Sequence, residues 1–271
     1  MVWRYRLDIA YDGSQFFGWQ VQPGRRTIQG ELAAMLERLG ESVLPTGAGR
    51  TDAGVHALGN TAHADLTRAW EDRELTAALQ SLAPADVRVT RARKVAGDFH
   101  ARYQAVERCY AYALASSPEP FFRERRWNRR RLPAAGWVRR ALASFAGLRD
   151  CASLARSGSE SRSTRCDIRG TAWEPGGIGA VFRISADRFL YGMVRTIVGT
   201  IVRGFEKGLD PECFESALAA HRRSAAGEAA PPQGLYLTGV RYPGEPETAP
   251  GPIRTIAGLD PGDPRSRGVR V

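Results

Sequence analysis

Residues 47–66, GAGRTDAGVHALGNTAHADL, hold a single aspartate, Asp52, in a glycine-rich loop that leads into a short strand. The glycines of this loop, which permit backbone angles that other residues avoid, are Gly47, Gly49 and Gly54. An aspartate in such a loop either hydrogen-bonds its own turn or carries out chemistry, and the local pattern alone favours the first role. Arg50 lies close by and the protein is basic, and this combination favours a chemical role for Asp52.

Helices and strands alternate on both sides of this loop. Trp3, Tyr5 and Leu7 alternate with polar residues, which is typical of a strand, and Thr27 precedes an apolar stripe of helical spacing, as an N-cap does. The expected strands cover about 3–11, 61–66, 87–95, 108–115, 166–173, 179–185 and 235–242. The expected helices cover about 27–39, 72–82, 134–145, 189–205 and 211–221. This order predicts a layered α/β or α+β fold without a sequence repeat.

The chain is large enough and basic enough to restrict its class. It has 271 residues, of which 43% are hydrophobic, enough for one large domain or two smaller ones. The formal net charge is +10, and all 39 basic residues except Lys94 and Lys207 are arginines. A genome biased toward arginine codons explains this without any function. A polyanionic partner also explains it, because arginine binds phosphate with two donors and stacks on bases.

The sequence lacks the motifs that identify several functional classes of protein. No apolar run is long enough to span a bilayer, and the first residues, MVWRYRLDIAYDG, lack a secretory pattern, so we expect a cytoplasmic protein without membrane contact. The four cysteines form no CxxC pair and the histidines no HExxH. Gly47-Ala48-Gly49 lacks the third glycine of a dinucleotide fingerprint, and no GK[ST] follows it. We therefore expect neither a metal nor a cofactor.

The loop and its flanks also carry a family likeness. GAGRTDAGVHA resembles the signature of the TruA-type tRNA pseudouridine synthases. Further blocks resemble the same family in the right order, and they are YDGSQFFGWQVQP, TIQGELAAML, DFHARYQAVERCYAY, FLYGMVRTIVGT and GLYLTGVRY. The family commonly has glutamine where Asn60 stands and phenylalanine where Ala64 stands, so we expect altered local packing there and unchanged chemistry. The residues beyond Tyr242 resemble no block.

The resemblance implies isomerisation of uridine to pseudouridine in the anticodon arm of tRNA, at positions 38, 39 and 40, without a cofactor. It also implies a homodimer, and two similar α/β halves around a central, mainly antiparallel sheet, with helices on the outer face and the active cleft between the halves. We place the N-terminal half at 1–107, the C-terminal half at 108–245 and a mobile tail with little to bury at 246–271. Two alternatives stay open: an RNA-binding module without catalysis, and a related synthase with another RNA target.

The resemblance assigns the catalytic role to Asp52. A carboxylate suits the reaction because it can attack the sugar or the base, or stabilise a cationic sugar and accept a proton, and the sequence leaves these routes open. A carboxylate that stays ionised in a dry pocket needs a cation, since removing the partner of a buried charge costs about 3–5 kcal/mol. The resemblance assigns this partner to Arg195, and the apolar residues around it in MVRTIVG support a buried partner independently.

Three further residues receive substrate-binding roles from the resemblance. Tyr110 packs on the target base, where stacking contributes about 1–3 kcal/mol, although the alternation in CYAY also fits a buried strand residue. Arg50 fills the space that the flipped nucleotide leaves; its plainer interpretation is a surface phosphate contact. Leu235 forms an apolar wall of the pocket. His56 and His63 receive no role, because a loop histidine is more often structural than catalytic.

Residues 123–131, RERRWNRRR, carry six arginines around one tryptophan. A run of charge is usually a solvated loop, but an aromatic among cations also suits phosphate contact with base stacking. We expect this segment to bind the RNA, with Arg156, Arg162 and Arg165 as a second contact. The affinity should then fall steeply with salt, because bound phosphates release their counterions.

Overall fold

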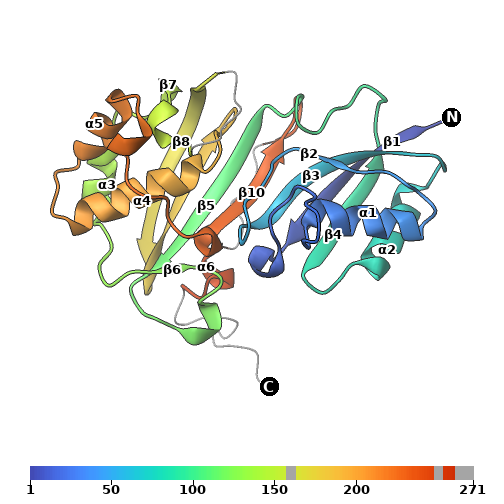
Figure 1. The fold of residues 1–271 in the computed structure, drawn as a ribbon, viewed down its shortest axis with the longest axis horizontal. Helices are drawn as coiled ribbons and strands as arrows, with labels where there is room; N and C mark the ends of the chain where they lie inside the picture. Colours follow the sequence, from blue (N-terminus) through green and yellow to red (C-terminus); the bar gives the residue numbers. More distant parts are fainter. Residues whose placement is uncertain (157–162, 247–252, 260–271) are drawn as a thin grey trace. The chain divides into compact units, whose positions relative to one another are not determined.

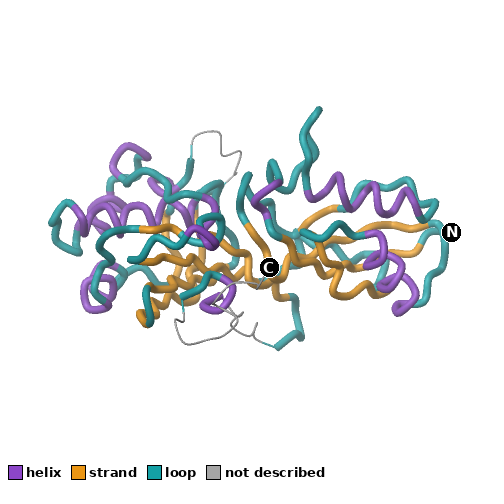
Figure 2. The backbone as a smooth tube through the Cα atoms, turned by 90° about the horizontal axis from the view of Figure 1, so that it is seen from below, coloured by secondary structure: helices purple, strands orange, loops and turns teal. Residues whose placement is uncertain are grey.

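The computed structural model describes residues 1–156, 163–246 and 253–259, and the chain divides into two compact units (Figure 1). Unit 1 combines Met1–Arg108 with Tyr236–Ala249, and unit 2 combines Cys109–Leu235 with Pro250–Val271. Both units join helices to mostly antiparallel strands (Figure 2), which confirms the predicted mixed α/β class. The division into functional halves at 107/108 stays a prediction.

Unit 1 is built from one sheet and two helices. Its elements are β1 (Trp3–Tyr11), a 3-10 turn (Gly13–Gln15), α1 (Ile28–Arg38), β2 (Thr46–Gly47), β3 (His56–Leu66), α2 (Asp72–Leu82), β4 (Val87–Lys94) and β10 (Leu235–Arg241). The strand order is β4-β1-β3-β10. β1 pairs antiparallel with β3 and β4, β2 pairs antiparallel with β3, and β10 runs parallel to β3. The first helix begins as expected, since Thr27 accepts a hydrogen bond from the Gly30 N–H.

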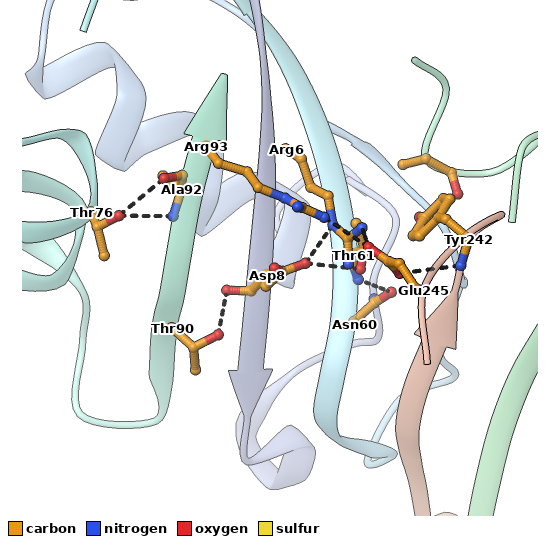
Figure 3. A network of polar contacts seen from close by, with 11 residues as sticks. Arg6, Asp8, Asn60, Thr61, Thr76, Thr90, Ala92, Arg93, Tyr242 and Glu245 are labelled. Atoms are coloured by element: carbon orange, nitrogen blue, oxygen red, sulfur yellow. Dashed lines mark hydrogen bonds and ion pairs between the residues drawn. The ribbon is translucent and has the colours of Figure 1, made fainter. Parts of the chain in front are cut away.

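The alternation of β1 separates an apolar face of this sheet from a polar one. The fully buried apolar residues of β1 are Tyr5, Leu7 and Ile9. On the other face Arg6 and Asp8 form an ion pair, and Glu245, which follows β10, bonds to both Arg6 and Arg93 (Figure 3). Burial alone would raise the pKa of Glu245, but the hydrogen bond and charge of Arg6, together with hydrogen bonds from Arg93 and the Tyr242 N–H, lower it. An ionised carboxylate therefore holds the segment after β10 on the sheet.

Helix α2 covers the edge strand β4. Asp72, Thr76 and Gln80 are four residues apart, so they lie on one face of the helix. Each exchanges a hydrogen bond of 2.8 Å with the backbone of β4, and Figure 3 shows the contact at Thr76. These bonds satisfy edge groups that would otherwise be open to pairing with another strand.

Unit 2 combines further strands with four helices among its described residues. Its elements are β5 (Glu107–Ala115), β6 (Trp127–Asn128), α3 (Ala135–Ala141), β7 (Gly147–Asp150), β8 (Arg165–Gly176), β9 (Gly179–Ala186), α4 (Met193–Glu206), α5 (Cys213–Ala219), α6 (Ile253–Ile256) and 3-10 turns at Pro120–Phe122, Ala152–Leu154, Arg223–Ala225 and Pro232–Gly234. The strand order is β5-β9-β8-β7, and β6 pairs parallel with β5. No helix among the described residues has the length and apolar composition needed to span a bilayer.

Two elements begin four or more residues away from the predicted position. β3 begins at His56 instead of 61, because HALGN has no clear alternation yet pairs with β1, and His56 pairs with Tyr236 of β10. α4 begins at Met193 instead of 189, because Gly192 has a φ of +67°, a left-handed conformation outside the α-helical range.

The segment 253–259 packs into unit 2, contrary to the expectation of a tail with little to bury. The side chains of Ile253, Ala257 and Leu259 are fully buried. The Ile178 N–H donates to the Leu259 carbonyl at 3.3 Å. The remaining residues of the predicted tail from 247 on lie outside the described residues.

Candidate active site

The loop that carries Asp52 starts as part of the unit 1 sheet. Thr46 and Gly47 form β2 and pair with His63 and Ala62 of β3. The next residue, Ala48, donates from its N–H to the Thr61 carbonyl at 2.7 Å. The entry of the loop is therefore held by backbone hydrogen bonds to a central strand.

A second segment, residues 16–19, supports the middle of the loop. The Trp19 N–H donates to the Thr51 carbonyl at 3.0 Å, and the Gly54 N–H donates to the Phe16 carbonyl at 3.2 Å. Gly18 has a φ of +88°, and a Cβ there would lie 2.6 Å from the Thr51 oxygen. Only glycine fits this position, because it lacks the Cβ that would meet the loop backbone.

A buried polar cluster of Tyr11, Thr51 and Asn60 lies beneath the loop. The Tyr11 hydroxyl lies 2.9 Å from Thr51 Oγ1, and Asn60 Nδ2 donates to the Tyr11 hydroxyl and to the Gly49 carbonyl. Burial raises the pKa of Tyr11 to about 12, so its hydroxyl stays protonated at neutral pH and can take part in this hydrogen bond as donor or acceptor. The cluster fixes Gly49 and Thr51, the neighbours of Arg50, and sequence reasoning had missed its role.

The middle of the loop is more accessible than its two ends. Asp52 is half-buried, its own carbonyl accepts the Val55 N–H at 3.2 Å, and both Arg50 and Ala53 are exposed. Among the three glycines of the loop, Gly54 alone has a positive φ, of +76°. The loop is thus a tight turn whose two ends are buried and whose crest is accessible to solvent at Arg50 and Ala53.

The two histidines near the loop are buried and hydrogen-bonded. His56 stacks on Tyr236 at 4.7 Å, and its Nδ1 lies 3.1 Å from the Gly13 N–H. His63 Nδ1 accepts the Ala101 N–H at 3.2 Å. Both positions agree with a structural role.

Arg195 lies in the first turn of α4 in unit 2. Its Nε donates to the Ala230 carbonyl at 2.8 Å, and the Ala230 N–H donates back to the Arg195 carbonyl at 2.8 Å. The side chain is half-buried, and its apolar neighbours Val194 and Ile197 are buried. This reciprocal pair of bonds orients the guanidinium at the N-terminus of the helix.

Tyr110 and Leu235, the other two predicted site residues of unit 2, are both buried. Tyr110 on β5 packs edge-to-face on Phe189, with ring centroids 5.0 Å apart. Leu235 follows the 3-10 turn Pro232–Gly234 and is 6% exposed. Arg50 and Asp52 belong to unit 1 and these residues to unit 2, so a site that combines them is part of the proposal below.

A sequence profile described as tRNA pseudouridine synthase matches residues 9–104 and 141–243. The chain belongs to the tRNA pseudouridine synthase family. The matched ranges contain Arg50, Asp52, Arg195 and Leu235, whereas Tyr110 lies between them. Members of this pseudouridine synthase family are isomerases, so the protein is an enzyme of that class.

Curated relatives within the tRNA pseudouridine synthase family are similar over nearly their whole length. Proteins named tRNA pseudouridine synthase A from Cereibacter sphaeroides and Moorella thermoacetica are each 40% identical, covering 91% and 88% of this chain and 99% and 98% of theirs. The one from Paracoccus denitrificans is 40% identical over 88% of this chain and 96% of its own. A solved structure from Galdieria sulphuraria, 12% identical with a TM-score of 0.23 over 82% of this chain and 92% of that one, is too distant to inform the fold.

In this synthase the basic segment 123–131 is only partly available for RNA. Arg126 is 1% exposed and donates to the carbonyls of Ala257, Gly258 and Ser117. Trp127 is 6% exposed, which contradicts its expected role in base stacking. The exposed arginines of the segment are Arg123, Arg130 and Arg131.

Further residues in and near this segment also differ in their exposure. Arg129 pairs with Glu206, whereas Phe121, just before the segment, is 80% exposed. Arg156, half-buried, packs over Tyr191, and Arg165 is exposed. Arg162 lies outside the described residues.

Across the described part of the chain, no group of three or more His, Cys, Asp or Glu is arranged to hold a metal ion.

Proposed function

We propose that the protein isomerises uridine to pseudouridine at positions 38, 39 and 40 of the tRNA anticodon arm, with Asp52 as the catalytic carboxylate and no cofactor. The observation that carries this proposal is the support of the Asp52 loop from three directions: β3, residues 16–19 and the Tyr11–Thr51–Asn60 cluster. A catalytic group must be held within a fraction of an ångström of its productive position, and a backbone with fixed hydrogen bonds meets that demand.

The reaction itself needs a charged group and no redox partner. The bond between C1′ and N1 of uridine breaks, a bond between C1′ and C5 forms, C5 loses a proton and N1 gains one, so the atomic composition is unchanged. A carboxylate can form an adduct at the ribose or the base, or stabilise a cationic sugar and carry the proton. Each route requires Asp52 ionised and shielded from water.

The proposed partner that keeps Asp52 ionised is Arg195. The bond from its Nε to Ala230 orients the guanidinium, and the first turn of α4 contains no acidic residue. The positive end of the helix dipole therefore adds to the charge of Arg195, and both favour a carboxylate or phosphate placed nearby.

The remaining residues are proposed to bind the flipped nucleotide. Tyr110 stacks on the target uracil, on the ring face that its edge-to-face contact with Phe189 leaves, and Leu235 forms an apolar wall of the pocket. Arg50, exposed at the crest of the loop, fills the vacated position in the RNA stack, whose opening costs a few kcal/mol. We also propose a homodimer, which light scattering would detect as twice the 29.7 kDa mass of one chain.

The deciding experiment incubates wild type and Asp52→Asn with tRNA that carries uridine at positions 38–40 and maps pseudouridine by sequencing. We expect complete conversion by wild type, a loss of at least about 10³-fold in rate for Asp52→Asn, and equal tRNA affinity. Asp210→Asn, an exposed aspartate of unit 2, is the matched control and should keep full activity.

The same experiment separates the alternatives. Pseudouridine at other uridines would assign another RNA target to the same chemistry. Binding of tRNA by wild type without any product would indicate an RNA-binding module and overturn the proposal.

A further inference from the structure

The loop at residues 98–105 presents an aromatic side chain to solvent beside the Asp52 loop. Tyr103 is 76% exposed, more than any other aromatic residue of unit 1 among those described. Its ring packs on His100 with centroids 4.3 Å apart and planes inclined by 32°. The Arg102 guanidinium lies 5.8 Å from the ring centroid. Most of this large aromatic side chain is thus exposed to solvent, with the Arg102 guanidinium near its ring.

This loop is held rigidly, although its crest is exposed. His100 Nδ1 accepts the N–H groups of Arg102 and Tyr103 at 3.2 Å each. The His100 N–H donates to Gln104 Oε1, and the Gln104 N–H donates to the His100 carbonyl, both at 3.1 Å. The Tyr242 hydroxyl donates to the Ala101 carbonyl at 2.7 Å. Tyr103 is therefore pre-organised, and a ligand that stacks on it loses little conformational entropy in the loop.

Arg108 ties this loop to the start of the Asp52 loop. Its Nη2 donates to the Arg102 carbonyl at 2.6 Å and to the Ala48 carbonyl at 3.3 Å. Its Nη1 donates to the Ala105 carbonyl at 2.9 Å. The carbonyls of Arg102 and Ala48 accept hydrogen bonds from the same guanidinium nitrogen of Arg108. The exposed ring of Tyr103 therefore lies on the turn adjacent to the loop that holds Asp52.

We propose that Tyr103, with His100 behind it and Arg102 beside it, is a stacking platform for a base of the RNA strand next to the target uridine. The inference rests on the proposed function, since the RNA must reach the Asp52 loop. An exposed ring backed by a second ring and flanked by arginine is the arrangement with which proteins bind unpaired bases, and arginine adds a phosphate contact. The chain's net charge of +10 favours the same polyanion.

The test measures kcat and KM for pseudouridine formation on tRNA with Tyr103→Ala, Tyr103→Phe and Arg102→Gln. Tyr103→Ala should raise KM about 5- to 150-fold, the factor that one base–aromatic stack contributes, and leave kcat unchanged at saturating tRNA. Tyr103→Phe keeps the ring and should behave as wild type. Arg102→Gln should lower the slope of log affinity against log salt by about 1.

Leu148→Ala, which truncates an exposed apolar residue of unit 2, is the surface control and should change neither parameter. An unchanged KM for Tyr103→Ala with active wild type would overturn the platform and leave the proposed function intact. An altered oligomeric mass of Tyr103→Ala with unchanged KM would also overturn it and assign the ring to a protein contact. A wild type without product would refute the proposed function itself.

Discussion

The Asp52 loop in unit 1 and the arginine-rich segment 123–131 in unit 2 show how differently two polar loops use their side chains. In the first, the supporting contacts come from backbone groups and a small buried cluster, and Arg50 stays exposed. In the second, the charged and aromatic side chains themselves provide support, since Arg126 is buried against the backbone of 257–258 and Trp127 is covered.

This difference teaches that charge in a sequence does not by itself indicate a surface for RNA. Arg126 and Arg130 are both arginines and only four residues apart, yet Arg126 is buried in a structural contact and Arg130 is exposed to solvent. A buried guanidinium with its hydrogen bonds made is costly to remove. RNA binding by the exposed arginines of the segment stays a prediction.

The largest effect expected from this contrast is on stability. Arg126→Leu leaves the buried carbonyls of Ala257 and Gly258 without their donor, so the free energy of unfolding should fall by about 3–5 kcal/mol. Arg130→Ala should change it by less than about 0.5 kcal/mol and instead lower the salt dependence of tRNA binding. Urea unfolding monitored by circular dichroism measures the first, and filter binding the second. Equal destabilisation by both variants would remove the distinction.

The next effect, on catalysis, tests whether the backbone supports the Asp52 loop. Gly18→Ala adds a Cβ 2.6 Å from the Thr51 oxygen, and a shift of about 1 Å in the loop should lower kcat roughly 100-fold. Gly24→Ala is the matched control, because Gly24 also has a positive φ, of +66°, but nothing within 4 Å of an added Cβ. It should lose about 1–2 kcal/mol of stability from strain and keep kcat. If the two variants have the same kcat, the loop does not depend on Gly18.

The smallest effect concerns pH. Burial lowers the pKa of His63 to about 4, with the charges of His100 and Arg4 acting in the same direction and Asp65 opposing them. The unfolded chain binds this proton at a pKa of about 6.5, so stability is complete above that pH and decreases as the pH falls toward 4. The loss at pH 5 should be about 2 kcal/mol.

His63→Gln should remove this part of the pH dependence. Unfolding free energies of both proteins between pH 7 and 5 measure it. Protonation also takes the acceptor from the Ala101 N–H, so amide exchange at Ala101 should accelerate in wild type over the same range. A wild type as stable at pH 5 as at pH 7 would show that His63 is not held neutral in the fold.

Most helices and strands followed from local pattern, and the exceptions have a common cause. The strand over Trp3–Tyr11 and the helix over Asp72–Leu82 match their predicted ranges, because alternation and helical spacing act within a few residues. The start of β3 and the buried segment 253–259 depend on partners distant in sequence, as do β2, β6 and β7. For the site, the sequence pointed to Asp52, while the Tyr11–Thr51–Asn60 cluster carries no local mark.

By itself the sequence determined the α/β class, the family and the residues proposed for chemistry, because short-range periodicity and motif blocks are properties of the chain alone. Only the tertiary structure decided which polar side chains form hydrogen bonds that support the fold and which remain available to a ligand. The physical reason is that burial and hydrogen-bond partners are set by residues far apart in sequence: Asn60 beneath Gly49, Arg126 against Ala257, and Arg108 between Ala48 and Arg102.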